Sequence, residues 1–293
     1  MKNRNIVKQD YKLVNARYKL NTSEIKFIMT AIAQIDVNDK EFQEYEIKVS
    51  ELEQKLQAEQ NETRLKQFAK KLMSKPLEVP TDNGFIVFNW FSKIQYIRNQ
   101  SKFIVRIDND LKPYLLELRE RFVKYNLKYI INLQSNYSIR LYQLLKEYEK
   151  LTRRTFTVNE LQELLQVPNS YKKKYNDFKK KVLKVAEKEL IENCDIFFEF
   201  EEIKEGRKVN EILFRIKKNP KFLHQNEPKL FDIDIPGKFL KFIGKKIKVK
   251  EQGQIIERQI ISIEPYSDFL KIYLDVGTVQ VENLEQLQKA ILT

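Results

Sequence analysis

Lysines recur at helical spacing along residues 171–190. At about 100° per residue, Tyr175, Phe178, Val182 and Val185 share one face, which we predict to be buried. The opposite ridge of the helix carries Lys173, Asn176, Asp177, Lys180 and Lys184. Ammonium groups neutralise phosphates, and an asparagine amide can pair with the edge of adenine. We expect base-edge contacts from Lys173 and Asn176, and phosphate contacts from Lys172, Lys174, Lys180 and Lys184. A solvated lysine face is the competing interpretation.

Two further sets of side chains could make the same contacts. In residues 63–74, an apolar stripe that includes Leu65, Phe68, Leu72 and Met73 leaves four polar residues outward. The outward residues are Arg64, Gln67, Lys70 and Lys71. Two expected β-hairpins have basic tips, which we assign to the adjacent DNA backbone or minor groove. The tip residues are Arg98 and Lys102 in the first, and Lys204, Arg207 and Lys208 in the second.

The net charge supports a polyanionic partner. The 293 residues contain 54 Lys and Arg against 41 Asp and Glu, for a net charge of +13. Charge of this sign fits DNA, RNA or an anionic membrane surface. No apolar run is long enough to span a membrane, and the first ten residues do not resemble a signal peptide. Cys194 is the single cysteine, which excludes an internal disulfide or a cysteine zinc site. We therefore expect a cytoplasmic protein.

The elements that position these residues occur twice. Residues 47–56 align with residues 156–165, and Val49, Glu51 and Leu52 are matched by identical residues in the second copy. The copies lie on the order of 100 residues apart, which fits a duplicated domain better than a solenoid unit. Two similar basic domains in one chain suggest a protein that reads an extended polymer, and DNA is the polymer we favour.

Each copy predicts the same order of elements. In the first, helices over 23–35, from Ser50 and over 63–74 precede strands over 85–97 and 103–107. The second has helices over 138–150, from an Asn159 cap and over 171–190, then strands over 196–202 and 209–216. Gly206 supplies the positive φ of the second hairpin turn. Three helices followed by a hairpin form a winged helix-turn-helix. Residues 111–133 are expected to be a helix and a linker.

The chain beyond Pro220 has a different composition. Prolines and glycines separate short β-rich runs at 246–250, 255–263 and 270–274, and residues 282–292 are expected to close the chain as a helix. Residues 236–250 hold six lysines and no acid. That stretch is either a third nucleic-acid patch or a solvated strand edge, and both interpretations remain open.

We therefore predict an α+β protein with two tandem winged-helix domains and a small β-rich C-terminal appendage. The expected domains are 1–133, which includes the linker helix, 134–220, and 228–293, whose role is unassigned.

Catalytic alternatives find little support. A rolling-circle nicking enzyme needs paired histidines for its metal, and His224 is the only histidine. No phosphate-binding loop of the P-loop type is present. Asp232 and Asp234 resemble a primase-like carboxylate pair, but no further acids lie near them. We expect a DNA-binding protein without catalytic residues, metal or cofactor.

Several segments together resemble the iteron-binding replication initiators of theta-type plasmids. The resemblance covers roughly residues 5–219 and rests on residues 7–21, the Glu24-Ile-Lys-Phe helix, the string Tyr137-Ser-Ile-Arg-Leu-Tyr-Gln-Leu-Leu-Lys146 and residues 157–165. It implies that monomers bind direct repeats at an origin, melt an adjacent AT-rich region, and recruit the host initiator and replicative helicase. It also implies dimers, joined through the first winged helix, that repress their own gene. Residues after Pro228 depart from the family pattern.

Three functions remain to be separated. A plasmid replication initiator is favoured. A stand-alone winged-helix transcriptional regulator would bind an inverted operator only as a dimer, and a nicking enzyme would leave a covalent protein–DNA adduct.

Overall fold

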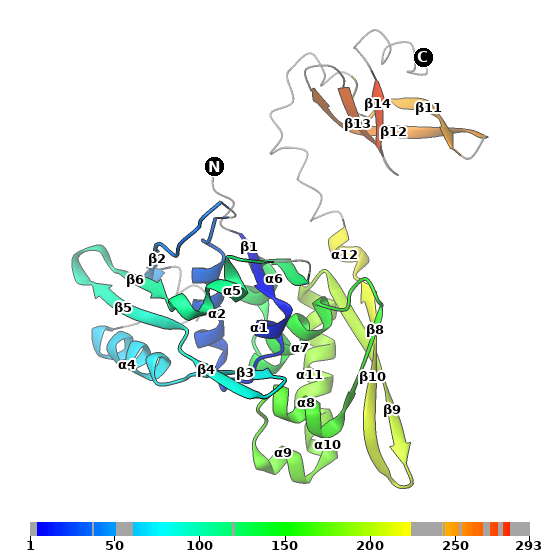
Figure 1. Ribbon diagram of the computed structural model, residues 1–293. Coiled ribbons are helices and arrows are strands. Elements are labelled where there is room, and N and C mark those ends of the chain that lie inside the picture. Colours follow the sequence, from blue (N-terminus) through cyan, green and yellow to red (C-terminus); the bar gives the residue numbers. More distant parts are fainter. Residues whose placement is uncertain are drawn as a thin grey trace. The chain divides into compact units, whose positions relative to one another are not determined.

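The structure is a computed structural model of the 293-residue chain. It describes residues 5–36, 38–50, 61–118, 121–223, 242, 244–251, 254–265, 270–274 and 278–281. Two compact units are present, Met1–Pro220 and Lys221–Thr293. Figure 1 shows the larger unit in blue through yellow-green, with helices and antiparallel sheets intermixed. No helix among the described residues is long and apolar enough to cross a membrane.

The first half of the larger unit contains a winged helix with several additions. Its elements are β1 (Ile6–Asp10), α1 (Tyr11–Val14), α2 (Thr22–Ile32), β2 (Glu44–Lys48), α4 (Glu62–Met73), β3 (Leu77–Thr81), β4 (Gly84–Phe88), β5 (Phe91–Ile97), η1 (Arg98–Gln100), β6 (Lys102–Ile107), η2 (Asn109–Leu111), α5 (Lys112–Leu115), β7 (Phe122–Asn126) and α6 (Leu127–Asn132). A three-stranded sheet in the order β2-β6-β5 carries the wing. The helix predicted to follow Ser50 falls on residues 51–60, which lie outside the described residues.

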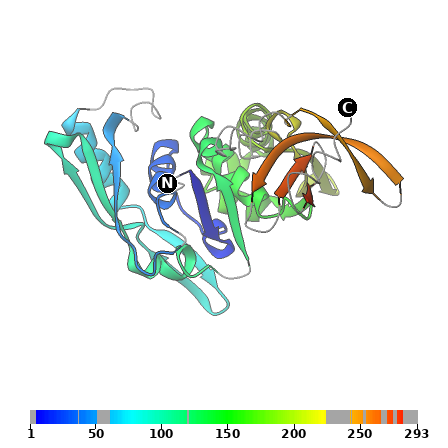
Figure 2. The ribbon, with the colours of Figure 1, turned by 90° about the horizontal axis from the view of Figure 1, so that it is seen from above.

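Helix α2 is the centre of this half. Asn21 begins it with a capping box, because its side chain accepts from the Glu24 amide and Glu24 accepts from the Asn21 amide. The sequence predicted one apolar stripe, but every residue from Glu24 to Ile32 is buried. In Figure 2 the helix lies between the β2-β6-β5 sheet on one side and the second half of the unit on the other. Elements therefore cover it all round, and the Phe27 ring meets Phe91 and Phe103 edge-on.

Two predictions for the first half are wrong in detail. Residues 111–133 are not one helix with a linker, because β7 lies between the short helices α5 and α6 and pairs antiparallel with β1, with Val7 opposite Tyr125. Val123 and Tyr125 are buried while Phe122 and Lys124 are exposed, which is the two-residue period of a strand. The run 85–97 is two strands rather than one, because β4 pairs with β3 and β5 pairs with β6.

The second half repeats the winged helix. Its elements are α7 (Asn136–Lys146), β8 (Arg153–Thr157), α8 (Val158–Leu164), α9 (Asn169–Lys173), α10 (Tyr175–Phe178), the π-helical turn η3 (Lys179–Leu183), α11 (Lys184–Asn193), β9 (Ile196–Glu205) and β10 (Lys208–Lys218). Helix α12 (Pro220–Leu223) spans the boundary between the two units in the sequence. The sheet order is β8-β10-β9. Phe214 packs on Phe156 and Phe198, with ring centroids 5.9 and 5.2 Å away. These aromatic contacts join the strands into one core.

Helix α8 begins two residues earlier than the sequence suggested. The Thr157 hydroxyl accepts a hydrogen bond from the Glu160 amide at 3.1 Å, so Thr157 is the N-cap in place of Asn159. Both residues are good caps by type. The β8 pairing decides between them, because Thr157 is the last residue of the strand, opposite Glu211.

The long helix predicted over residues 171–190 is interrupted twice. Lys174 has extended backbone angles of φ −127° and ψ 94°, which separate α9 from α10, and η3 then inserts a wider turn before α11. The wider turn advances the buried stripe by one residue. Ala186 and Leu190 are fully buried, whereas Val185, which we expected in the core, is 36% exposed. A uniform helical wheel cannot represent this change of register.

The smaller unit is β-rich, as predicted. Strands β11 (Lys246–Glu251), β12 (Gln254–Pro265), β13 (Leu270–Leu274) and β14 (Thr278–Val281) form one antiparallel sheet in chain order. Ile247, Ile260, Ile263 and Ile272 are buried in it. The predicted closing helix over residues 282–292 lies outside the described residues, as does most of the lysine run that precedes β11.

Candidate nucleic-acid interface

The first candidate surface is the outer side of α4. Asn61 caps the helix by accepting from the Arg64 amide at 2.9 Å. Leu65 and Leu72 are buried against the domain, while Met73, which we expected in the stripe, is 38% exposed. All four predicted residues lie on the exposed side: Arg64, Gln67, Lys70 and Lys71. This face is therefore sterically available to a ligand.

The wing of the first domain is less available than its sequence suggested. Arg98 lies at the tip, and its guanidinium donates to Glu62 on α4 at 2.7 Å. That hydrogen bond lowers the pKa of the Glu62 carboxyl. Lys102 pairs with Glu46 across the sheet at 2.6 Å, and its side chain is only 17% exposed. Carboxylates of the protein thus already accompany both cations.

The second candidate surface surrounds the start of the helix α10–η3–α11. Exposed side chains gather at its N-terminal side and on its outer ridge: Lys172, Lys173, Lys174, Asn176 and Lys180. The break at Lys174 places the first three on α9 and the loop, ahead of the helix that carries Asn176. Lys184 is exposed too, but it pairs with Glu187 at 2.7 Å and its ammonium lies 4.9 Å from the centre of the Phe200 ring. Lys184 therefore turns toward β9.

Contacts with β9 fix the start of this helix. The Tyr175 hydroxyl donates to Glu202 at 2.9 Å, and Lys179 pairs with the same carboxylate at 2.7 Å. Burial raises the pKa of the Tyr175 hydroxyl, and the hydrogen bond to Glu202 adds to the increase. Desolvation acts to raise the pKa of Glu202, but the hydrogen bonds from Lys179 and Tyr175 outweigh it and the pKa is lowered. The helix and its wing are thus linked by one ionised carboxylate.

The tip of the wing in the second domain carries three cations and one acid, Glu205. Gly206 turns the β9–β10 hairpin at φ +60°, as the sequence predicted. Its neighbours Lys204, Arg207 and Lys208 are exposed and have no ion-pair partner among the described residues. Farther from the tip, cations on β10 pair with acids on β9, such as Arg215 with Glu201. Among the described residues of this wing, the tip cations are thus held less closely by carboxylates than Arg215 and Lys217, although Glu205 lies opposite Lys208 and Lys204 interacts electrostatically with Glu202.

The two winged helices are joined through residues 14–22, which we call the strap. Arg140 on α7 is buried, and its guanidinium donates to the carbonyls of Val14 and Ala16 at 3.0 and 2.9 Å and to the Tyr18 hydroxyl at 2.6 Å. The Asn136 side chain donates to the Leu20 carbonyl at 3.2 Å. Two of the segments singled out in the sequence, residues 7–21 and 137–146, thus meet in this contact. The contacts that Arg140 and Asn136 make with the strap hold the two domains relative to each other.

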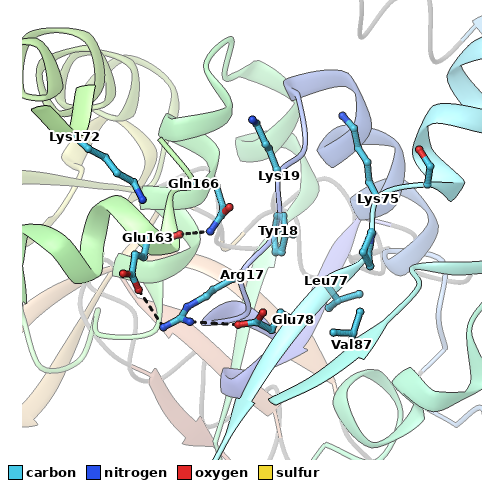
Figure 3. Close-up of a pocket in the computed structure, with 12 residues that line it drawn as sticks. Arg17, Tyr18, Lys19, Lys75, Leu77, Glu78, Val87, Glu163, Gln166 and Lys172 are labelled. Atoms are coloured by element: carbon cyan, nitrogen blue, oxygen red, sulfur yellow. Dashed lines mark hydrogen bonds and ion pairs between the residues drawn. The ribbon is translucent and has the colours of Figure 1, made fainter. Parts of the chain in front are cut away.

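A cleft opens where the strap passes between the domains. Its volume is about 660 Å³, and residues from the strap, from the segment after α4, from β3 and β4, and from α8 and α9 line it. Figure 3 shows the Arg17 guanidinium between Glu78 and Glu163, at 3.3 Å from each. Sequence analysis missed this cleft, because its residues share no periodicity. It also missed Lys181, which is exposed and lies 5.0 Å from the centre of the Tyr171 ring.

No catalytic constellation is evident in the described parts of the chain. No group of three His, Cys, Asp or Glu side chains could hold a metal ion there. Cys194 is buried, and burial raises the pKa of its thiol, which opposes formation of a thiolate. His224, Asp232 and Asp234 lie outside the described residues. The candidate site is a set of basic surfaces.

Fold and surfaces define a tandem winged-helix protein with two exposed basic helix faces. Comparison with known families gives two matches, the WH1 domain of the Initiator Replication protein family over residues 6–146 and the WH2 domain of the initiator Rep proteins over residues 157–216. Together these matches cover more than half of the chain, and the chain belongs to the family of Rep replication initiators. The first match runs past residue 133 and includes α7, which in the structure packs against α11.

Individual relatives agree with the family. A replication initiation protein of Escherichia coli is 26% identical over 220 residues, which are 70% of this chain and 67% of the relative. The crystal structure of the Pi initiator protein in complex with iteron DNA superposes with a TM-score of 0.60 at 20% identity. That superposition covers 75% of this chain and all of the Pi chain, and it shows a shared fold.

Proposed function

We propose that this Rep protein starts plasmid replication by binding direct repeats in double-stranded DNA with both winged helices of one molecule. The observation that carries the proposal is the presence, in one compact unit, of two exposed basic helix faces, one on α4 and one at the start of α10–η3–α11. The Pi protein, which shares the fold, was crystallised on iteron DNA. That finding supports DNA as the ligand here.

The geometry of each winged helix indicates which residues contact bases and which contact phosphates. Asn176 is exposed on the first turn of α10, where residues of a recognition helix approach base edges. Lys173 precedes it on α9 and remains our second base-edge candidate. The exposed lysines on both helices and at the second wing tip are assigned to phosphates. Two major-groove contacts about one helical turn apart require a site of roughly 20 base pairs.

Initiation also requires steps beyond binding. We infer that binding energy and DNA bending melt an adjacent AT-rich tract without nucleotide hydrolysis. Bound monomers would then recruit the host initiator and the replicative helicase, whereas dimers would repress the gene for the protein. The family membership supports this sequence of events.

Footprinting on DNA that carries tandem copies of the cognate repeat tests the proposal. We expect one monomer per repeat, with protection of about 20 base pairs and hypersensitivity in a neighbouring AT-rich tract. Protection of about 10 base pairs per monomer would overturn the assignment of both domains to one repeat. Binding only as a dimer to an inverted site would instead identify a transcriptional regulator. A covalent protein–DNA adduct that survives denaturation would identify a nicking enzyme.

A further inference from the structure

The cleft between the winged helices holds three cations that lie outside the two candidate recognition surfaces, together with Lys172, which belongs to the second of them. Four basic residues line it: Arg17, Lys19, Lys75 and Lys172. Two acids, Glu78 and Glu163, line it as well. In Figure 3, Lys19 and Lys75 extend side by side in the same direction, away from the Leu77 and Val87 side chains. The cleft is thus an open basic surface between the two candidate DNA-reading helices.

These cations differ in how far the protein already neutralises them. Lys75 donates to both oxygens of the buried Glu24 carboxylate, at 2.7 and 2.8 Å. Arg17 is shared between Glu78 and Glu163. The side chains of Lys19 and Lys172 are exposed, and neither ammonium has an ion pair or hydrogen bond with another described residue. Lys19 and Lys172 are therefore the groups most ready to receive an anion.

The position of the cleft identifies the anion. Two of its lining residues, Ser74 and Lys75, directly follow α4. Another, Lys172 on α9, belongs to the second candidate surface, so the cleft lies between the two candidate surfaces. If both helices enter major grooves on one face of a duplex, the phosphates that flank the intervening minor groove face the protein between them. No other class of anion is presented there as a regular row.

We propose that this cleft is a phosphate-binding saddle for the DNA backbone at the centre of each repeat. The proposal rests on the proposed function, and it adds a third contact between the two major-groove contacts. Lys19 and Lys172 hold phosphates directly. Arg17 is held by Glu78 and Glu163, whose carboxylates offset its positive charge. Glu163 both restrains Arg17 and repels the DNA backbone. This arrangement binds the centre of the DNA repeat without reading its base sequence.

Paired variants test the saddle. Lys19→Ala and Lys172→Ala should each weaken binding to the cognate repeat by on the order of fivefold to tenfold near 0.1 M salt. Each should also make the negative slope of log K against log salt shallower by about 0.9. Lys124→Ala is the matched control, because Lys124 is an exposed lysine on β7 outside the cleft. Glu163→Gln should change binding in the opposite direction and raise affinity for cognate and random DNA alike.

Chemically modified DNA locates the contact. Uncharged methylphosphonates at the central phosphates of the repeat should weaken the wild-type protein, but they should weaken the Lys19→Ala/Lys172→Ala double variant much less. Equal losses for both proteins, or variants that bind like Lys124→Ala, would overturn the saddle and leave the proposed function standing. Absence of any preference of the wild-type protein for the repeat would overturn the proposed function itself. Thermal melting of every variant confirms that the fold is kept.

Discussion

The two winged helices share one plan and differ in how much of their positive charge is free. In the first, Glu62 and Glu46 accompany Arg98 and Lys102 at the wing. In the second, the three exposed cations of the wing tip around Gly206 form no salt bridge with a described residue, although Glu205 lies next to them. Exposed ion pairs offer little net charge to a third partner. The second domain is therefore expected to carry more of the DNA contact, and the first to add orientation.

Their reading helices differ as well. Helix α4 buries two leucines and is otherwise a regular 12-residue helix on the domain surface. The helix of the second domain buries residues on all three of its segments, including Phe178, Leu183 and Leu190, and Glu202 links its start to the wing. A helix held at several points keeps its exposed side chains in a fixed orientation. Base readout depends on such a fixed orientation, which again favours the second domain.

The largest difference between the domains should appear in stability. Phe178→Ala removes a fully buried ring from the second helix and should lower the free energy of unfolding by about 3–5 kcal/mol. Phe68→Ala on α4 removes a half-buried ring that meets Phe27 at 5.2 Å, and its cost should be clearly smaller. Chemical denaturation of both variants measures the difference. Equal costs would contradict the view that only the second helix is deeply anchored.

Base readout provides the next test. Asn176→Ala or Lys173→Ala should cost about 1–3 kcal/mol on the cognate repeat and much less on random DNA. Gln67→Ala on α4 should cost less than either, while Lys180→Ala should weaken cognate and random binding by similar factors. Paired titrations of the two duplexes give all four values. Unchanged specificity in the Asn176 and Lys173 variants would show that this helix does not read bases.

The wings should differ in the salt dependence of binding. Arg207→Ala should make the negative slope of log K against log salt shallower by about 0.9, because a cation that forms no salt bridge with a described residue is removed. Arg98→Ala should change the slope less, since Glu62 already holds that guanidinium. Affinities measured between low and moderate salt give the slopes. A larger effect from Arg98 than from Arg207 would reverse the comparison between the domains.

The smallest expected effect is the pH dependence of stability that Glu202 contributes in the second domain. The pKa of Glu202 in the folded protein lies below its ordinary value of 4.5, so its interactions stabilise the fold fully at neutral pH. That contribution is lost as the pH falls below 4.5, through the folded-state pKa. Glu202→Gln should therefore reduce stability at pH 7 but converge with wild type in acid. Melting curves of both proteins between pH 7 and acid pH measure this. A difference in stability between variant and wild type that stayed constant with pH would contradict the prediction.

Local sequence determined much of this protein. Alternating and helical spacing predicted the core residues Phe178 and Val182, the hairpin at Gly206, and most of the helices followed by a terminal hairpin in each domain, because side-chain burial and backbone φ are set by neighbouring residues. The exposed cations of α4, α9 and the second wing tip follow from the same spacing. Family membership was predictable too, because it rests on strings of residues that the sequence contains outright.

Long-range packing decided the rest. Residues 122–126 form β7 because β1, more than a hundred residues earlier in the chain, pairs with them as an antiparallel strand. The wider turn at 179–183 buries Ala186 in place of Val185, since packing against α7 and β9 sets the register of that helix. Lys102 became an ion-pair partner through a strand that only the fold places beside it. Charge partners and clefts depend on which distant segments meet, and no local pattern encodes that.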